Sequence, residues 1–127
     1  MNERKLSQAQ KFKKLELVLE EIKTLGKLKG VILADRDGVL ITENVGEDKD
    51  YNMFSAMCAS VLESAEGLGH SIGGNVSKII TELDEQTIVI IQCENKTFLS
   101  FIIEKDSHFG LVLDKMADYK QKIEKLL

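Results

Sequence analysis

Two near-continuous apolar runs constrain the fold more than any other feature of this sequence. They are "TIVIIQC" at residues 87–93 and "TFLSFIIE" at residues 97–104, separated by "ENK". Short runs rich in β-branched and aromatic residues, bounded by turn signals, indicate strands that are buried on both faces. A connection this short suits a hairpin and therefore antiparallel pairing. We expect two central strands of an antiparallel sheet, covered by helices on both sides.

Three further strands are predicted around this pair. The stretch "NVSKIITEL", residues 75–83, is joined to the first run by "DEQ", and its Lys78 and Glu82 favour an edge strand. The stretch "GVILADRDGVLIT", residues 30–42, has two short apolar runs about Asp37 and Gly38. An Asp-Gly pair is a hairpin signal because a primed turn needs positive φ.

Helical periodicity separates and flanks these strands. Apolar residues recur at steps of three and four from Leu6 to Leu25, with Ser7 and Gln10 as a capping box and Gly26 as a left-handed stop. A last helix begins near Ser107. The predicted fold class is α/β (α+β), with a five-stranded antiparallel sheet between helices in the order α-β-β-α-β-β-β-α.

A second helix, at residues 51–68, has an unusual composition. Its expected apolar side is made of Phe54, Met57, Val61, Ala65 and Leu68. The rest is rich in serine, alanine and cysteine, and small side chains allow another backbone to come close. We therefore expect this helix to pack against the sheet on one face and a second helix on the other.

Composition and charge narrow the class of protein. The 127 residues, 43% hydrophobic and 30% charged, fit one domain spanning 1–127. The apolar runs are too short to cross a membrane and the first residues are too polar for a signal peptide, so we expect a cytoplasmic location without membrane insertion. Residues 30–95 carry twelve acids against three basic residues, and the net charge is −4. This balance argues against nucleic acid as a partner.

Candidate catalytic and ligand-binding residues each have a simpler explanation. Arg36 lies at a hairpin tip between Asp35 and Asp37, and we expect an exposed turn side chain rather than a group that reaches a nucleotide. His70 and His108 lack metal-ligand spacing, and Cys58 and Cys93 are isolated thiols that fit a reducing compartment. The run "GLGHSIGGN" lacks the Lys-Ser/Thr of a phosphate loop. We predict no catalytic residue, no cofactor and no metal, and therefore no enzyme.

A local acidic cluster follows the hairpin tip. We assign it to turn formation, solubility and helix capping by Asp48 or Asp50, because its spacing does not match a calcium loop. Its members are Asp35, Asp37, Glu43, Glu47, Asp48 and Asp50.

The ordered elements resemble a known family. The first helix, "GVILADRDGVLIT", "FSAMCASVLESAEGL", the two apolar strands and the closing "SHFGLVLDKM" are similar to the Roadblock family, the dynein-light-chain and longin-related domain of small-GTPase regulators. The likeness runs from about Leu6 to Leu127. It implies a dimer joined through the second helix and the following edge strand. It also implies a Ras-like small GTPase as partner, whose hydrolysis is accelerated or which is anchored in a larger assembly.

The residues of these two elements support the same interface. An edge strand with unpaired backbone groups is a liability alone and an interface when paired. We predict a dimer interface, with itself or with a second Roadblock chain, made of Met53, Ala56, Met57, Ser60, Val61, Ser64, Val76, Lys78 and Ile80.

Two other functions stay open at this point. One is a small-ligand sensing domain, with a metabolite between sheet and helix, although the strands offer few polar groups beyond Thr81, Gln92 and Ser100. The other is a structural subunit of a larger complex without GTPase regulation. The favoured hypothesis is a non-enzymatic dimeric module that binds a Ras-like GTPase and modulates its nucleotide cycle or location.

Overall fold

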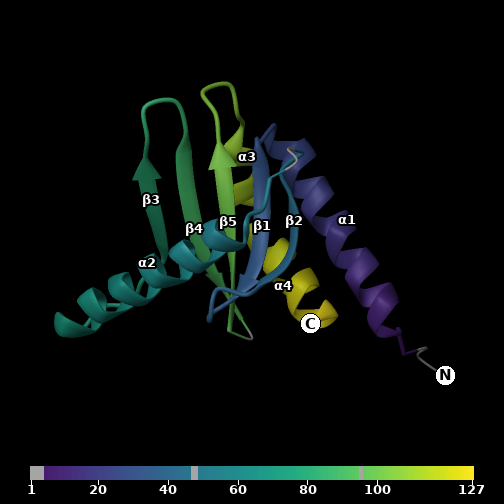
Figure 1. The fold of residues 1–127 in the computed structure, drawn as a ribbon, viewed down its shortest axis with the longest axis horizontal. Coiled ribbons are helices and arrows are strands. Elements are labelled where there is room, and N and C mark those ends of the chain that lie inside the picture. Colours follow the sequence, from purple (N-terminus) through teal and green to yellow (C-terminus); the bar gives the residue numbers. More distant parts are fainter. Residues whose placement is uncertain (1–4, 47–48, 95) are drawn as a thin grey trace.

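The computed structural model describes residues 5–46, 49–94 and 96–127. In these residues the chain forms five strands and four helices (Figure 1). In chain order they are α1 (Gln8–Gly26), β1 (Gly30–Asp35), β2 (Leu40–Asn44), α2 (Asn52–Ser71), β3 (Lys78–Glu82), β4 (Thr87–Cys93), β5 (Thr97–Ile103), α3 (Phe109–Asp114) and α4 (Met116–Leu126).

The strands form one antiparallel sheet in the order β2-β1-β5-β4-β3. The predicted central pair is confirmed, because β4 and β5 pair along their whole length, from Thr87↔Ile103 to Cys93↔Thr97. The predicted edge strand is also confirmed, since β3 pairs with β4 alone. The mixed fold class with a five-stranded antiparallel sheet between helices is therefore as expected.

Helices cover both faces of the sheet. α1, α3 and α4 lie on one face and α2 crosses the other diagonally (Figure 1). Side chains alternate between the two faces along each strand, so Val31 and Leu33 of β1 join the first cluster and Ala34 joins the second. On the α1 side the helices contribute a core of Leu15, Val18, Leu19, Ile22, Val112, Met116, Tyr119 and Ile123.

The β1–β2 hairpin differs from the predicted turn type. Gly38 has φ +87°, but Asp37 is not among the residues with positive φ, so this is not a type I′ turn. The Gly38 amide donates to the Asp35 carbonyl at 3.0 Å, and the register shifts between Leu33 and Ala34. The Asp35 amide donates to the Val39 carbonyl at 3.0 Å, so residues 36–38 form the common three-residue hairpin loop with its left-handed glycine, and the register shift is a separate bulge at Ile41.

The ends of α1 confirm one sequence signal and correct another. The Ser7–Gln10 capping box is present, with the Gln10 amide 3.1 Å from Ser7 Oγ. The left-handed residue is Lys27, with φ 49°, instead of Gly26. Gly26 is the last helical residue, and a Cβ there would lie 2.7 Å from Val112 Cγ2. The glycine is thus needed for close packing of α1 against α3.

The predicted last helix is divided in two. Lys115, with φ −109° and ψ 10°, separates α3 from α4. The start of this region is attached to the end of α1, because the His108 amide donates to the Gly26 carbonyl at 2.6 Å and Ser107 Oγ donates to the Lys27 carbonyl at 2.8 Å. The break lets α4 run back along α1 after α3 has packed at its end (Figure 1).

Candidate functional site

The outer face of α2 carries large apolar side chains that the chain itself does not cover. Met53 is 72% exposed, Met57 62%, Val61 43% and Leu68 69%. They recur at steps of four and seven, which places them along one side of the helix. Ala56, Ser60 and Ser64 are exposed beside them, so this stripe combines large apolar groups with small ones.

The opposite face of α2 packs on the sheet with mostly small residues. Ser55, Cys58, Ala59 and Leu62 are buried there. The expected apolar side therefore mixed two faces: Phe54 packs against the core, whereas Met57, Val61 and Leu68 point outward. The small residues serve a close approach to the molecule's own hairpin, because the ideal Cβ position at Gly38 lies 2.7 Å from the Ala56 Cα atom. The inner face of α2 therefore carries mostly small residues, and the large apolar side chains of Met57, Val61 and Leu68 are left exposed.

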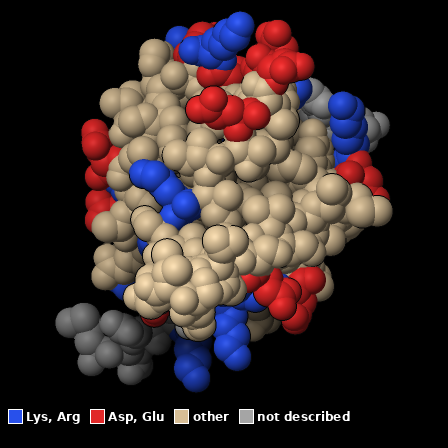
Figure 2. All heavy atoms as spheres, turned by 90° about the vertical axis from the view of Figure 1, so that its left-hand side faces the viewer, with Lys and Arg blue, Asp and Glu red and all other residues tan. Residues whose placement is uncertain are grey.

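The edge strand β3 extends this exposed region. Its residues are mostly exposed, with Ile80 at 55%, and its outer side pairs with no other strand of the described chain. Leu83 and Ile72, just outside β3 and α2, are 52% and 85% exposed. Figure 2 shows this side of the molecule as a broad uncharged area with acidic and basic residues mainly around its margin. We call this region the α2–β3 surface, comprising Met53, Ala56, Met57, Ser60, Val61, Ser64, Leu68, Ile72, Lys78, Ile80 and Leu83.

Eight of the nine predicted interface residues lie exposed in this region. They are Met53, Ala56, Met57, Ser60, Val61 and Ser64 on α2, with Lys78 and Ile80 on β3. Val76 precedes β3 and is half-buried against the core cluster beneath α2. Leu68, Ile72 and Leu83 were not predicted in this interface, although Leu68 continues the spacing of Met57, Val61 and Ser64. That these residues form an interface stays a prediction.

Two polar contacts fix α2 over the hairpin tip. Ser55 Oγ donates to the Gly38 carbonyl at 2.9 Å in a buried position. Arg36 Nη2 donates to Glu66 Oε1 in an ion pair whose side chains are 25% and 29% exposed. Arg36 is thus a half-buried partner of α2 and not the free turn side chain that we expected. Glu66 lies thirty residues further along the chain, a separation no local signal spans.

Three of the six members of the acidic cluster accept local hydrogen bonds. Asp35 Oδ1 accepts hydrogen bonds from the amides of Asp37 and Val39, and Glu43 Oε2 accepts one from Val45. Asp50 Oδ1 accepts from the amide of Asn52, the first residue of α2, and this bond lowers the pKa of Asp50. Asp48, which was the other proposed cap, and Glu47 lie outside the described residues.

The thiols are buried on opposite faces of the sheet. Burial raises the pKa of Cys58, which lies 3.5 Å from Ser100 Oγ, and raises the pKa of Cys93 to about 11. Thiols of this kind are poor nucleophiles.

Within residues 5–46, 49–94 and 96–127 no three His, Cys, Asp or Glu side chains gather to hold a metal ion. No helix in that part of the chain has the length and apolarity to span a membrane.

The fold defines a small α/β domain, an antiparallel five-stranded sheet with one long helix on one face and three on the other. The family model "Roadblock/LC7 domain" matches residues 14–103. The chain belongs to the Roadblock/LC7 domain family. A search of curated proteins found no match.

Solved structures share this fold at low sequence identity. The chain is 20% identical to Myxococcus xanthus MglB, with a TM-score of 0.82 over 91% of this chain and 95% of that one. It is 12% identical to the gliding protein MglB of Thermus thermophilus, with a TM-score of 0.81 over 91% and 90%. A Roadblock/LC7 domain of Streptomyces avermitilis is 13% identical, with a TM-score of 0.77 over 86% and 93%. The likeness at these identities is one of fold.

Proposed function

We propose that this protein is a non-enzymatic, cytoplasmic regulatory or scaffold module. It dimerises through the α2–β3 surface, and the dimer binds a Ras-like small GTPase and modulates its nucleotide cycle or its location. The observation that carries the proposal is the outward stripe of Met53, Met57, Val61 and Leu68 on a helix whose inner face is already packed on the sheet. Apolar patches of this kind mark association surfaces in soluble proteins.

The sequence of β3 suits pairing with its own copy. If two copies of β3 pair so that the two sheets become one, the two-fold axis runs perpendicular to the sheet and each side chain stays on its own face. Because neighbouring residues of a strand face opposite ways, the pair at the axis must consist of two copies of the same residue. An axis at Ile80 pairs all five residues of β3 and brings Lys78 opposite Glu82 of the partner subunit. Opposite charges in this position stabilise a strand pair, and the register repeats the contact twice.

The structural neighbours also support self-association, but less directly than the residues of α2 and β3 do. One of them, with a TM-score of 0.82 and 12% identity, is described as MglB with a tetrameric arrangement. For this chain we propose the dimer, because one helix face and one strand edge form a self-complementary patch. A heterodimer with a second Roadblock chain would use the same residues.

The GTPase partner is supported by family membership. A Roadblock resemblance implies a Ras-like GTPase, and the chain belongs to the Roadblock/LC7 domain family. A metabolite between sheet and helix, as in a sensing domain, is less well supported. The space beneath α2 is filled by Leu62, Ile90 and Phe98.

Sedimentation tests both parts of this proposal. The purified chain would be run alone and with each small GTPase of its own organism, loaded with GDP or with a non-hydrolysable GTP analogue. We expect a dimer that captures one GTPase in one nucleotide state, after which a hydrolysis assay separates an activator from a scaffold. A monomer at tens of micromolar would overturn the dimer. A dimer that binds none of these GTPases would overturn the GTPase part alone.

A further inference from the structure

A second feature of the sheet, separate from the α2–β3 surface, is the uncovered end of β4. β3 begins at Lys78, which pairs with Ile91, whereas β4 continues through Gln92 and Cys93 and pairs there only with β5. Successive residues of an antiparallel strand direct their N–H and C=O groups to alternate sides. One of Gln92 and Cys93 therefore presents both backbone groups to the open side of β4. Such an edge can accept an added strand.

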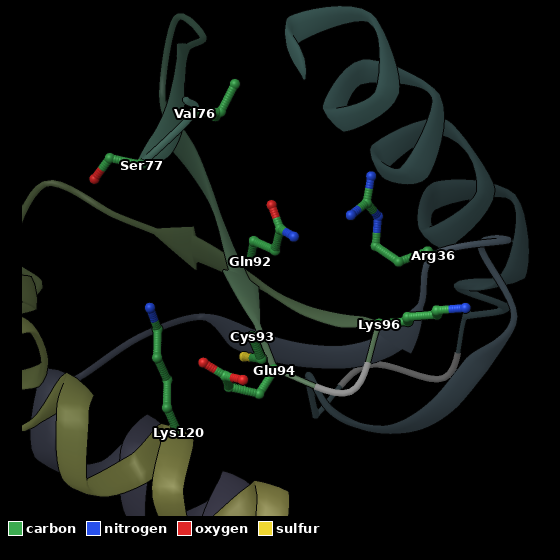
Figure 3. Close-up of a pocket in the computed structure, with 8 residues that line it drawn as sticks. All are labelled: Arg36, Val76, Ser77, Gln92, Cys93, Glu94, Lys96 and Lys120. Atoms are coloured by element: carbon green, nitrogen blue, oxygen red, sulfur yellow. The ribbon is translucent and has the colours of Figure 1, made fainter. Parts of the chain in front are cut away.

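A cleft of about 460 Å³ lies at this edge (Figure 3). Its walls are Arg36, Val76, Ser77, Gln92, Cys93, Glu94, Lys96 and Lys120. A second hollow of about 250 Å³ adjoins it beneath the end of α2, and the two share Val76 and Gln92. The cleft therefore continues along the edge of the sheet from the end of β4 towards α2.

The charge of the cleft favours an anion. Arg36, Lys96 and Lys120 line it, against Glu94, while Glu66 lines the adjoining hollow and already pairs with Nη2 of Arg36. Arg36 Nε is buried and has no hydrogen-bond partner among the described residues. In the same part of the chain, no hydrogen bond or ion pair engages the side chains of Gln92 or Lys120. Buried polar groups are nearly always paired, so the unpaired Nε of Arg36 points to a missing acceptor, while the half-buried side chains of Gln92 and Lys120 are available to a ligand.

The positions of Arg36 and Lys120 favour an extended anionic ligand over a compact one. Arg36 lies on the α2 side of the sheet, where it meets Glu66. Lys120 extends from α4 on the opposite side, beside Cys93 (Figure 3). A compact anion would meet the cations of one side only. An extended peptide places successive side chains on opposite faces, so two adjacent acidic residues would meet Arg36 and Lys120 in turn.

We propose that the edge of β4 at Gln92–Glu94 binds an acidic segment of a partner protein in extended conformation. The segment continues the sheet in line with β3, and two neighbouring carboxylates pair with Arg36 and Lys120. The backbone of β4 supplies the strand-like hydrogen bonds, and the Gln92 amide contacts the segment on the α2 side. Apart from Val76, which lines the cleft and was also predicted in the dimer interface, this site uses none of the self-association residues, and it does not depend on the proposed GTPase.

Synthetic peptides test the site on the full-length chain. The probe is a labelled peptide of threonines and valines with two adjacent aspartates at its centre, titrated by fluorescence anisotropy. One control has the same composition with the aspartates two positions apart, so that both point to one face; another replaces them by asparagines. We expect the adjacent-aspartate peptide to bind about tenfold more tightly than the spaced one and the asparagine peptide to bind more weakly still. Equal affinity for the three peptides, or succinate binding as tightly as the first, would overturn the proposal.

Variants of the cleft locate the binding. Arg36→Gln and Lys120→Gln should each weaken the adjacent-aspartate peptide about tenfold, and Glu94→Gln should strengthen it severalfold. Lys122→Gln is the matched control, because Lys122 lies on the same helix, two residues on, and its side chain is 53% exposed. In NMR spectra the peptide should shift the amides of Gln92 and Cys93. Loss of binding in Lys122→Gln equal to that in Lys120→Gln would contradict the site. Sedimentation of each variant should match the wild type, which separates peptide binding from self-association.

Discussion

The Gly38 carbonyl accepts a hydrogen bond from the Ser55 hydroxyl at 2.9 Å, and this bond joins the tip of the β1–β2 hairpin to the first turn of α2. At the same point the backbone of Gly38 lies so close to α2 that an added Cβ would be 2.7 Å from the Ala56 Cα atom. The β1–β2 hairpin thus determines where α2 lies on the sheet.

Replacing Gly38 by alanine should lower the stability of the fold sharply. Gly38 has φ +87°, which an L-residue adopts only with strain, and the new methyl group would meet backbone. We expect Gly38→Ala to lower the free energy of unfolding by about 2 to 4 kcal/mol in urea titrations. Gly73→Ala is the control, because Gly73 has φ +77° with nothing near its Cβ position. It should lower that free energy by about 1 kcal/mol, and equal losses would contradict the close approach to Ala56.

A charge on the outer face of α2 should prevent self-association. Met57→Asp places a carboxylate within the proposed interface, where its desolvation is unfavourable, and we expect the dimer to weaken about 100-fold. Leu17→Asp is the matched control, because Leu17 lies on α1 and is 57% exposed, close to the 62% of Met57. Light scattering should give a monomer for Met57→Asp and a dimer for Leu17→Asp. A dimer for both would remove α2 from the interface.

A charge exchange tests the register of β3. Lys78→Glu would bring like charges together at two symmetric positions of the proposed strand pair, and the dimer should weaken about tenfold. Adding Glu82→Lys to the same chain restores opposite charges in the register centred on Ile80. Sedimentation equilibrium should show recovery in the double variant. If the dimer affinity of the double variant is reduced by the sum of the losses in the two single variants, β3 pairs in another register or not at all.

Alkaline pH should destabilise the fold through Cys93. Burial raises the pKa of its thiol to about 11, while the nearby Lys120 ammonium acts in the opposite direction. The stabilisation is fully present below the ordinary thiol pKa near 8.5 and is lost as pH rises through the folded value, because the unfolded chain releases its proton first. Between pH 8 and pH 11 we expect a loss of about 2 to 3 kcal/mol from this group. Urea titrations of Cys93→Ala at both pH values should show a smaller pH difference than the wild type.

Much of the sheet follows from local sequence. Residues 87–93 form strand β4 as predicted, because a short apolar run between two turns is shielded from water only in the core. The edge position of β3 follows from Lys78 and Glu82, whose charges remain exposed. The capping box of Ser7 and Gln10 is a local motif and is present as expected.

Contacts between distant segments were not predictable in the same way. The pairing of Arg36 with Glu66 depends on how α2 crosses the sheet, which no spacing encodes. The sequence placed Phe54 and Met57 on one side of α2, whereas Phe54 packs against the core and Met57 is exposed. The close hairpin, which no spacing encodes, selects Ser55 and Ala59 for the inner face. The last helix is divided at Lys115, where no proline or glycine stands, so this break could not be predicted from the sequence.

The far end of α2 has a consequence for motion. All four buried residues of this helix lie at or before Leu62, and its last turns project past β3 (Figure 1). Those turns have little tertiary packing, so they should open by local unfolding at a small free energy, while the first turns open only with the whole domain. Amide hydrogens from Gly67 to Ser71 should therefore exchange fast in a monomer and slow down on association. Hydrogen exchange in this one segment would report the assembly state residue by residue, without any label on the protein.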